Sequence, residues 1–184
     1  SEMCIRDSIT QIARFESFVD DDAPLSEVLP ELYNAHKERY KGYTIRELCQ
    51  EMHDFYKSVN VKDLQKAMFR KEYFPRRVLN AQEANYEFIR DNVELVRLSE
   101  AEGRVGVEGA LPYPPGVLCL VPGEVWGGAV LQYFLALEEG INLFPGFAPE
   151  LQGVYIEEDE DGRQVAWANV LTHERETELL GKAL

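Results

Sequence analysis

The chain has 184 residues and a mass of 21.1 kDa, a size that suits one domain or a small pair of domains. Its 19 basic and 33 acidic side chains give a net charge of −14, which argues against nucleic-acid binding through a broad basic surface and against docking on anionic membranes. Hydrophobic residues make up 45% and charged residues 28% of the chain, as in an ordinary globular protein rather than a disordered one.

The composition divides the chain into two halves. Residues 1–98 carry a net charge of −3 and residues 99–184 a net charge of −11, and 12 of the 13 glycines follow residue 100. We therefore expect a helical segment over 9–98 and a separate domain over 99–184. The opening Ser-Glu-Met-Cys-Ile-Arg-Asp-Ser resembles a translated sequencing adapter, so residues 1–8 are expected to be an artefact and the chain a piece of a longer protein.

The first half is expected to be helical. Apolar residues recur every three or four positions over 25–36, which predicts one helix with Pro24 in its first turn. Thr44 and Glu47 have the spacing of a capping box, and the apolar stripe behind them predicts a helix that continues to Val59.

Two shorter helices follow. Asn60 is expected to cap a helix over 61–68, and Asn80 with Glu83 to start another that runs to about Arg90. A basic cluster lies in this part of the chain, and it is either a solvated face or a contact surface for an acidic partner segment. Its members are Lys62, Lys66, Arg70, Lys71, Arg76 and Arg77.

The second half mixes strands and helices. Residues 93–98 and the apolar run 117–121 predict strands, the second of them buried, whereas 104–107 fits either a strand or a short helix. Three prolines make 111–116 extended or turned and exclude a central strand there. A helix is expected from Pro122-Gly-Glu, with Glu124 favoured by the helix dipole, to a C-cap at Gly140.

The chain is expected to end in a hairpin and a polar tail. Residues 154–156 and 164–171 are expected to pair around Asp161-Gly162, which is a strong type I′ turn signal. The tail after His173 is expected to fray. The fold class is therefore α+β, a helical N-terminal half followed by a small mixed domain of sheet and helix.

The residue types that bind metals lack the required spacing. Cys4, Cys49 and Cys119 lie far apart and form no zinc motif, and they favour a reducing cytoplasmic setting. His36, His53 and His173 show no paired-ligand spacing. The acidic run 157–162 fits part of a calcium loop, but Ala168 stands where the closing glutamate is required, so a solvated hairpin tip is expected instead.

No cofactor motif is complete in the sequence. Asn34-Ala-His-Lys37 is near the Ser-x-His-Lys of some pyridoxal-phosphate enzymes, but Asn replaces Ser and Lys37 lies on the polar side of the expected helix. No GxGxxG or P-loop is present. No apolar run approaches the about 18 residues of a membrane span, and no signal-peptide pattern is found.

Several motifs together resemble one family, from about residue 9 to about residue 171. The chain is similar to the carboxy-terminal region of bacterial pyridoxal-phosphate-dependent ornithine/lysine/arginine decarboxylases. The motifs are Leu-Pro-Tyr-Pro-Pro-Gly-Val at 111–117, Pro-Gly-Glu at 122–124, Phe-Pro-Gly-Phe at 144–147 and Gly-Val-Tyr at 153–155. Residues 61–71 and 124–130 look closest to the ornithine branch.

The resemblance implies a cytoplasmic enzyme that converts L-ornithine to putrescine and carbon dioxide. The lysine that holds the cofactor belongs to the family's large central domain and has no match here, so no catalytic, cofactor-binding or metal residue is assigned and the chain alone is expected to be inactive. Its partners are expected to be the rest of the decarboxylase chain and further copies, in a homodimer or larger homo-oligomer.

The resemblance also implies that this region supports the active-site entrance and subunit contacts. The residues assigned to this entrance or interface segment are Pro112, Tyr113, Pro114, Pro115, Gly116, Pro122, Gly123, Glu124 and Trp126. The alternative is a free-standing acidic α+β module that binds or regulates a partner without catalysis. The genomic reading frame upstream of Ser1 distinguishes the two hypotheses.

Overall fold

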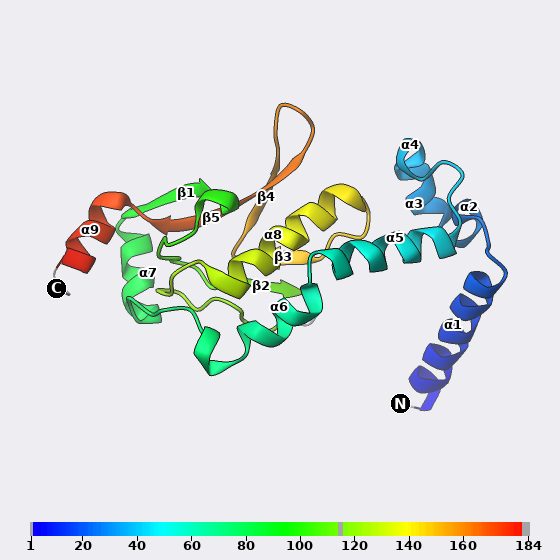
Figure 1. Ribbon diagram of the computed structural model, residues 1–184, viewed down its shortest axis with the longest axis horizontal. Helices are drawn as coiled ribbons and strands as arrows, with labels where there is room; N and C mark the ends of the chain where they lie inside the picture. The colour runs from blue at the N-terminus through cyan, green and yellow to red at the C-terminus, as the bar shows by residue number, and fades with distance from the viewer. Residues whose placement is uncertain (1, 114–115, 182–184) are drawn as a thin grey trace. The chain divides into compact units, whose positions relative to one another are not determined.

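The computed structural model describes residues 2–113 and 116–181, with side chains from residue 11 onwards (Figure 1). The chain forms two compact units, an N-terminal unit that ends at Ser58 and a C-terminal unit that begins at Val59. The first is helical and the second combines helices with two small sheets, so the predicted α+β class is confirmed. The contacts divide the chain 40 residues before the shift in composition near residue 99, because residues 59–98 pack with the second half.

The N-terminal unit holds five helices among the described residues. Its predicted single helix over 25–36 is wrong: the stretch is broken at Leu29, with φ −133° and ψ 65°. Pro30 has no amide hydrogen to donate, so it starts a new helix at N1, and Pro24 takes the N-cap position instead of the first turn. The helices are α1 (Glu2–Asp20), α2 (Leu25–Val28), α3 (Pro30–Ala35), α4 (Lys37–Tyr40) and α5 (Ile45–Ser58).

The capping box of α5 is confirmed. The Glu47 amide donates to Thr44 Oγ1 at 3.2 Å, and the Thr44 amide donates to Glu47 Oε2 at 3.0 Å. Arg46, in the first turn of α5, donates to the carbonyls of Val19 and Asp20 at the end of α1. These bonds satisfy two of the carbonyls that a helix C-terminus leaves unpaired.

The C-terminal unit begins with α6 (Val61–Met68), the 3₁₀ turn η1 (Lys71–Tyr73) and α7 (Ala81–Ile89). The predicted capping box of α7 is confirmed, with both Asn80–Glu83 bonds present. Helix α6 is also where it was predicted, but Asn60 takes a left-handed conformation, with φ 55°, and makes no side-chain cap bond. Its side chain therefore does not cap α6 in the way the sequence suggested.

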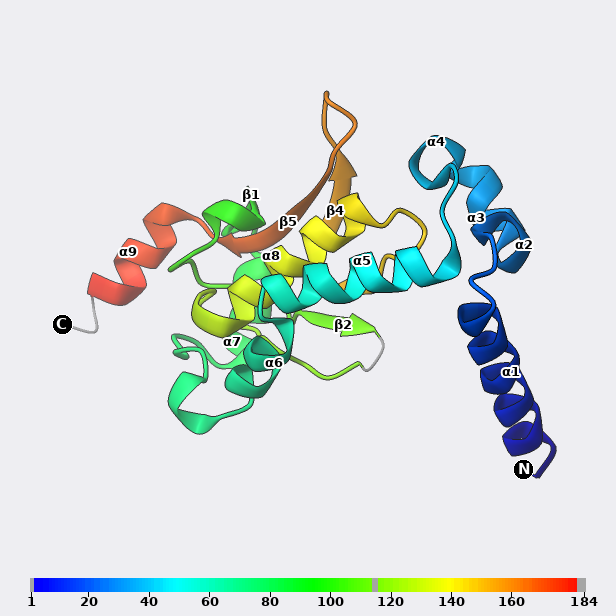
Figure 2. The same ribbon diagram turned by 45° about the vertical axis from the view of Figure 1, so that its right-hand side comes forward.

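An antiparallel sheet lies at the centre of the C-terminal unit, in the order β1-β5-β4. Its strands are β1 (Val93–Arg97), β4 (Tyr155–Glu158) and β5 (Gln164–Leu171), with Val93 opposite Leu171 and Tyr155 opposite Trp167. Helix α8 (Gly128–Leu143) packs against β5 (Figure 1 and Figure 2). A smaller antiparallel sheet pairs β2 (Leu111–Tyr113) with β3 (Glu150–Gln152), which agrees with the predicted extended or turned backbone over 111–113.

The main core lies between α8 and the larger sheet. Trp126 and Phe134 are both fully buried, and their rings meet edge to face with centroids 5.5 Å apart. Leu98, in the 3₁₀ turn η2 (Leu98–Glu100), and Val170 of β5 belong to the same cluster. Burying large aromatic and aliphatic side chains is the main source of stability in such a unit.

The predicted strand at 117–121 does not form, and 104–107 takes neither of its two predicted forms. In 117–121 only Leu120 makes a bridge, to Ala110, and Val117, Leu118 and Val121 are exposed. Residues 104–107 form neither a regular strand nor a helix. They make two isolated bridges, from Val105 to Val125 and from Gly106 to Val170.

Helix α8 is displaced from its predicted bounds. It begins at Gly128, so Glu124 lies four residues before it and outside the reach of its dipole, contrary to the prediction. It also continues past Gly140, which is buried inside the helix rather than at its C-cap, because Ile141 extends the apolar face.

The hairpin of β4 and β5 is confirmed, and its loop stands out from the rest of the C-terminal unit (Figure 1). The predicted type I′ turn is wrong, because only Gly162 has a positive φ, at 78°, whereas a type I′ turn needs two such residues. The Asp159 carboxylate accepts the amides of Asp161 and Arg163 at 3.0 and 2.9 Å. This local bonding favours an ordinary turn followed by a left-handed glycine.

The predicted frayed tail is also wrong up to Gly181, and residues 182–184 lie outside the described part of the chain. Residues after Thr172 form helix α9 (His173–Gly181), and Thr172 caps it by accepting the Arg175 amide at 3.3 Å. The charged side chains of α9 bond to the body of the C-terminal unit, as the next subsection describes. No helix in 2–113 or 116–181 is long and apolar enough to cross a bilayer.

Candidate functional site

A cleft of about 400 Å³ lies beside α6 in the C-terminal unit. Residues of three parts of the unit line it: α6 with the residue after it, β2 with the loop that follows, and α8. This volume is within the range of small-ligand pockets, and it also suits a side chain of a docking segment. The lining residues, called the α6 cleft below, are Lys62, Gln65, Lys66, Met68, Phe69, Pro112, Val117, Cys119 and Tyr133.

The α6 cleft has an apolar floor and a basic rim. Met68, Cys119 and Tyr133 are buried in the floor. Gln65 donates from Nε2 to the Tyr133 hydroxyl at 3.1 Å, which positions this hydroxyl in the cleft. Lys62 and Lys66 are exposed and lie one helical turn apart, so their ammonium groups face the same side.

The Cys119 thiol in the floor is not a reactive nucleophile. Burial raises its pKa to about 11, and its Sγ donates to the Val117 carbonyl at 3.3 Å. Since the thiolate is the nucleophilic form, a thiol with so high a pKa is almost wholly protonated near neutral pH. Cys119 therefore acts here as a small apolar side chain.

The first group of predicted entrance residues reaches the cleft in part. Pro112 is buried in β2 and lines it, whereas the Tyr113 side chain is 56% exposed on the same strand. Gly116 has φ +76° and donates its amide to the Pro112 carbonyl at 2.9 Å, which closes the turn after β2. Pro114 and Pro115 lie outside the described residues.

The second predicted group packs inside the unit. The Gly123 amide donates to the Gly106 carbonyl at 2.7 Å, and the Gly123 carbonyl accepts the amides of Val78 and Leu79. Glu124 accepts the Val121 amide at 2.8 Å, so it closes the turn that contains Pro122. Trp126 is 1% exposed. These residues support the loop from within, and an entrance or interface role stays a prediction for them.

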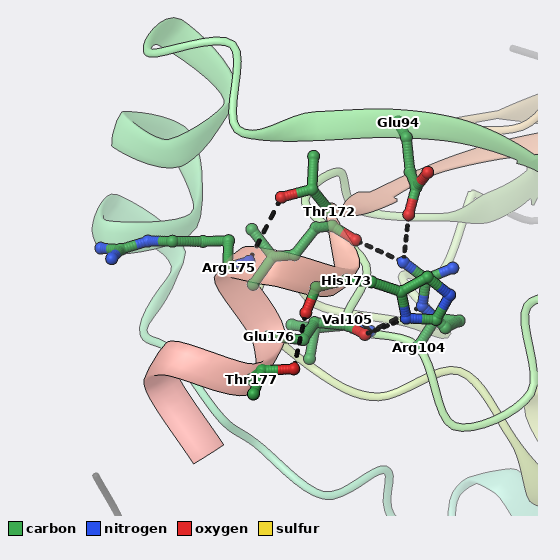
Figure 3. Close-up of polar contacts among 9 residues, drawn as sticks. Glu94, Arg104, Val105, Thr172, His173, Arg175, Glu176 and Thr177 are labelled. Atoms are coloured by element: carbon green, nitrogen blue, oxygen red, sulfur yellow. Dashed lines mark hydrogen bonds and ion pairs between the residues drawn. The ribbon is translucent and has the colours of Figure 1, made fainter. Parts of the chain in front are cut away.

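Arg104 joins four parts of the C-terminal unit at the base of α9 (Figure 3). Its guanidinium donates to Glu94 at 2.6 Å, to the Leu171 carbonyl at 2.6 Å and to Glu176 at 2.9 Å. The other oxygen of Glu176 accepts the Val105 amide at 2.8 Å. Arg104 is 9% and Glu176 8% exposed, so the two form a buried, hydrogen-bonded ion pair that fixes α9 to the unit.

A second ion pair holds the same helix. Arg175 of α9 donates to both carboxylate oxygens of Glu87 in α7, at 2.9 and 2.8 Å. Asn92 adds a bond to Glu87 at 2.6 Å. Sequence reasoning missed both clusters, although one signal was available: 99–184 contains just three arginines, and each of them, Arg104, Arg163 and Arg175, is ion-paired.

These clusters are suited to structure rather than to acid–base chemistry. Hydrogen bonds from Arg175 lower the pKa of Glu87, and those from Arg104 lower the pKa of Glu94, so both carboxylates stay ionised near neutral pH. Among the described residues, no group of three or more His, Cys, Asp or Glu side chains could hold a metal ion. The acidic hairpin tip has no calcium geometry of that kind.

The Glu87 pair predicts a stability loss at low pH. Its pKa is lowered in the folded state relative to an unfolded value of about 4.3, so its contribution is present above that value and is lost as the pH falls through the folded pKa. We expect Glu87→Gln to lower the free energy of unfolding by about 1.5–3 kcal/mol at pH 7. Urea unfolding should then show that the unfolding free energy of Glu87→Gln falls less between pH 7 and pH 3 than that of the unchanged chain.

Glu72→Gln is the matched control, because Glu72 is exposed and has no ion pair among those found in the described part of the chain. It should leave both the unfolding free energy at pH 7 and the slope of the decline unchanged. Parallel declines in Glu87→Gln and the unchanged chain would contradict the role given to Glu87.

Comparisons with known proteins agree on one family. The profile described as "Orn/Lys/Arg decarboxylase, C-terminal domain" matches residues 62–172. The chain is 68% identical over 163 residues to the inducible ornithine decarboxylase of Escherichia coli K12, and 52% identical over 162 residues to that of Lactobacillus sp. 30a. These matches cover 89% and 88% of this chain and 22% of each relative.

Solved structures show the same fold. Lysine decarboxylase A from Pseudomonas aeruginosa matches with a TM-score of 0.81 and 28% identity, over 91% of this chain and 22% of the other. The constitutive lysine decarboxylase of E. coli matches with a TM-score of 0.75 and 29% identity, over 89% and 23%. The chain spans less than a quarter of the length of these relatives, and it belongs to the Orn/Lys/Arg decarboxylase family, with residues 62–172 forming the C-terminal domain of that family.

Proposed function

We propose that this chain is the C-terminal part of an enzyme that decarboxylates L-ornithine to putrescine and carbon dioxide. One observation carries the choice of substrate. Identity is 52–68% to four ornithine decarboxylases but 28–35% to the lysine and arginine decarboxylases. A difference of this size within one family supports the ornithine branch, in agreement with the motifs at 61–71 and 124–130.

The residues that the structure describes do not fit pyridoxal phosphate, the cofactor expected for the whole enzyme. A Schiff-base lysine needs an enclosed pocket and an acidic partner for the pyridine nitrogen, and every lysine in the described part of the chain is exposed. Lys62 and Lys66 do line a cleft, but its described lining contains no carboxylate. When bound elsewhere in the enzyme, the cofactor supplies an electron sink for decarboxylation.

The test uses the 184-residue chain and the full-length decarboxylase side by side. We expect the full-length enzyme to release carbon dioxide from L-ornithine faster than from L-lysine or L-arginine. The chain alone, mixed with pyridoxal phosphate and borohydride, should show no reduced cofactor adduct by mass spectrometry and no decarboxylation. A trapped adduct on the isolated chain, or a full-length enzyme that prefers lysine, would overturn the assignment.

We further propose that the turn after β2 supports the active-site entrance or a subunit contact in the full enzyme, within a homodimer or larger homo-oligomer in the cytoplasm. Tyr113 is the strongest candidate, because it is exposed beside the α6 cleft on a strand whose backbone is paired. We propose no nucleic-acid or membrane partner.

Tyr113→Ala in the full-length enzyme is therefore expected to raise the KM for ornithine or to weaken subunit association several-fold. Steady-state kinetics and sedimentation measure these two effects. Tyr86→Ala is the matched control, because Tyr86 is a comparably exposed tyrosine on α7. If both variants match the unchanged enzyme in kinetics and in assembly, Tyr113 has neither role.

The alternative is a free-standing acidic module that binds a partner. The reading frame upstream of Ser1 separates the two functions. An in-frame extension of several hundred codons that includes Ser-x-His-Lys favours the decarboxylase, whereas a nearby start codon with a ribosome-binding site favours the module.

A further inference from the structure

The surface around α6 is basic in a chain that is otherwise acidic. Residues 62–77 carry six basic and two acidic side chains, a net charge of +4, while the whole chain carries −14. All six basic side chains are exposed. The ion pairs found for them in the described part of the chain amount to one weak contact, from Lys66 to Asp63 at 4.0 Å. The basic residues are Lys62, Lys66, Arg70, Lys71, Arg76 and Arg77.

This surface differs from the rest of the C-terminal unit. The arginines of the second half bond to carboxylates of their own chain, as Arg104 and Arg175 do at 2.6–2.9 Å. Among the described residues, Lys62 and Lys66 of α6 form no ion pair with a carboxylate outside that helix. A basic surface left in this state is complementary to a carboxylate-bearing partner, which gains attraction and specificity there.

Apolar side chains are exposed at the same place. Phe69 is 51% and Val117 45% exposed, and both line the α6 cleft. Leu118 and Val121, in the same loop as Val117 but outside the lining of the cleft, are 42% and 36% exposed. Single exposed apolar residues are normal, but a group of them around a cleft marks an interaction site. The cleft therefore combines an apolar binding surface with a basic rim.

The most economical source of a partner is the decarboxylase itself. This chain covers 22% of the ornithine decarboxylases it matches, so most of the polypeptide lies outside these residues. We propose that the α6 cleft binds an acidic segment from the part of the decarboxylase polypeptide that lies outside these 184 residues. This segment places a bulky apolar side chain in the cleft and carboxylates against Lys62 and Lys66. This inference rests on the proposed function and adds to it the surface and the chemistry of its partner.

The spacing of the two lysines restricts the segment. Residues four apart on a helix are separated by about 6 Å along its axis, and alternate residues of an extended strand are separated by about 6.6 Å. Two carboxylates with one residue between them, on an extended segment, therefore match Lys62 and Lys66. The expected sequence has Asp or Glu at two alternate positions and a large apolar residue at the next alternate position, so that all three side chains share one face of the extended segment.

The test is zero-length cross-linking of the full-length enzyme with a carbodiimide, which joins a lysine amine directly to a carboxylate that contacts it. We expect peptide mass spectrometry to find Lys62 or Lys66 linked to an Asp or Glu that precedes Ser1 in the full-length chain. Absence of such links would overturn the inference. A link from Lys66 to Asp63 is expected in any case, because the two lie 4.0 Å apart within α6. Links to other carboxylates of these 184 residues instead, such as the hairpin tip of a second copy at 157–161, would overturn the inference as well.

A charge-reversed pair provides the second measurement. Lys62→Glu/Lys66→Glu is expected to expose residues 61–69 to faster amide hydrogen exchange in the full-length enzyme, because like charges now repel the bound segment. Lys41→Glu/Lys57→Glu, which changes two exposed lysines of the N-terminal unit, should leave this exchange unchanged. Unchanged exchange in the first variant contradicts the inference. Lys62→Gln/Lys66→Gln, which removes the charge without reversing it, should give an intermediate effect.

Failure of this inference can be told apart from failure of the proposed function. An unmodified full-length enzyme that decarboxylates ornithine but forms no link from Lys62 or Lys66 contradicts the docking surface alone. One that forms the links but does not decarboxylate ornithine contradicts the proposed substrate and leaves the docking surface in place.

Discussion

Arg104→Met is expected to lower the unfolding free energy by about 3–5 kcal/mol, the usual cost of removing one partner from a buried ion pair. Glu176, 8% exposed, would keep its charge without the guanidinium that now bonds to it at 2.9 Å. The Leu171 carbonyl would lose a donor at 2.6 Å as well. Methionine fills much of the space of the arginine stem, so the loss would reflect the charge and its bonds more than a cavity.

Thermal and urea unfolding of the chain measure this loss. Arg163→Met is the matched control, because Arg163 pairs with Glu139 at the surface, where the two side chains are 51% and 40% exposed. Exposed pairs contribute about 0–1 kcal/mol. Equal losses in the two variants would show that burial does not decide the energy of the Arg104 cluster.

A double variant separates the charge from the packing. Arg104→Met/Glu176→Gln should be less destabilised than Arg104→Met alone, because the amide carries no charge and its oxygen can still accept the Val105 amide. Residues in direct contact are expected to couple in this way. A double variant at least as unstable as the single one would contradict an uncompensated buried charge as the cause.

Gly123→Ala is expected to cost about 2–5 kcal/mol. The φ of Gly123 is +89°, and an L-residue in this region costs about 1–2 kcal/mol. An alanine Cβ there would also lie 2.4 Å from the backbone oxygen of Leu79, and overpacking of that kind adds about 1–3 kcal/mol. The backbone of Leu79 cannot move freely, because its amide donates to the Gly123 carbonyl at 3.1 Å.

Gly162→Ala is the control for the backbone strain alone. Gly162 has φ +78°, but the nearest atom to its added Cβ lies 4.0 Å away, at the end of a glutamate side chain. Urea unfolding should therefore show a loss of about 1–2 kcal/mol for Gly162→Ala and a larger loss for Gly123→Ala. If the two losses agree, the contact with Leu79 does not contribute, and Gly123 is needed only for its conformation.

Gly123 illustrates how far a motif can be interpreted before the structure is known. The sequence predicts the start of a helix at Pro-Gly-Glu, 122–124, whereas the structure has a turn there and the helix begins at Gly128. The place of this turn was not predictable, because it depends on Leu79 and Gly106, which are 44 and 17 residues away. The α6 cleft has the same origin: Lys62, Pro112 and Tyr133 become neighbours only after three elements pack. Sequence reasoning had named Pro112 and the basic residues separately, without the cleft that joins them.

The sequence by itself determined the features that depend on near neighbours. Both capping boxes, Thr44 with Glu47 and Asn80 with Glu83, formed as predicted, because their bonds join residues three positions apart. The hairpin of β4 and β5 followed from its two apolar strands and Gly162. Grouped motifs also indicated the family, since turns with fixed Pro and Gly positions keep a sequence signature wherever they lie in the fold.

Only the tertiary structure decided which elements are buried by their neighbours and which are fixed by ion pairs to distant residues. The apolar run 117–121 resembles a buried strand, yet it lacks a neighbouring strand and stays largely exposed. The polar tail resembles a frayed end, yet Glu176 reaches Arg104 across 72 residues and fixes α9. Periodicity reports which face of an element is apolar, but not what packs on it. Ion pairs between distant residues leave no periodic pattern at all.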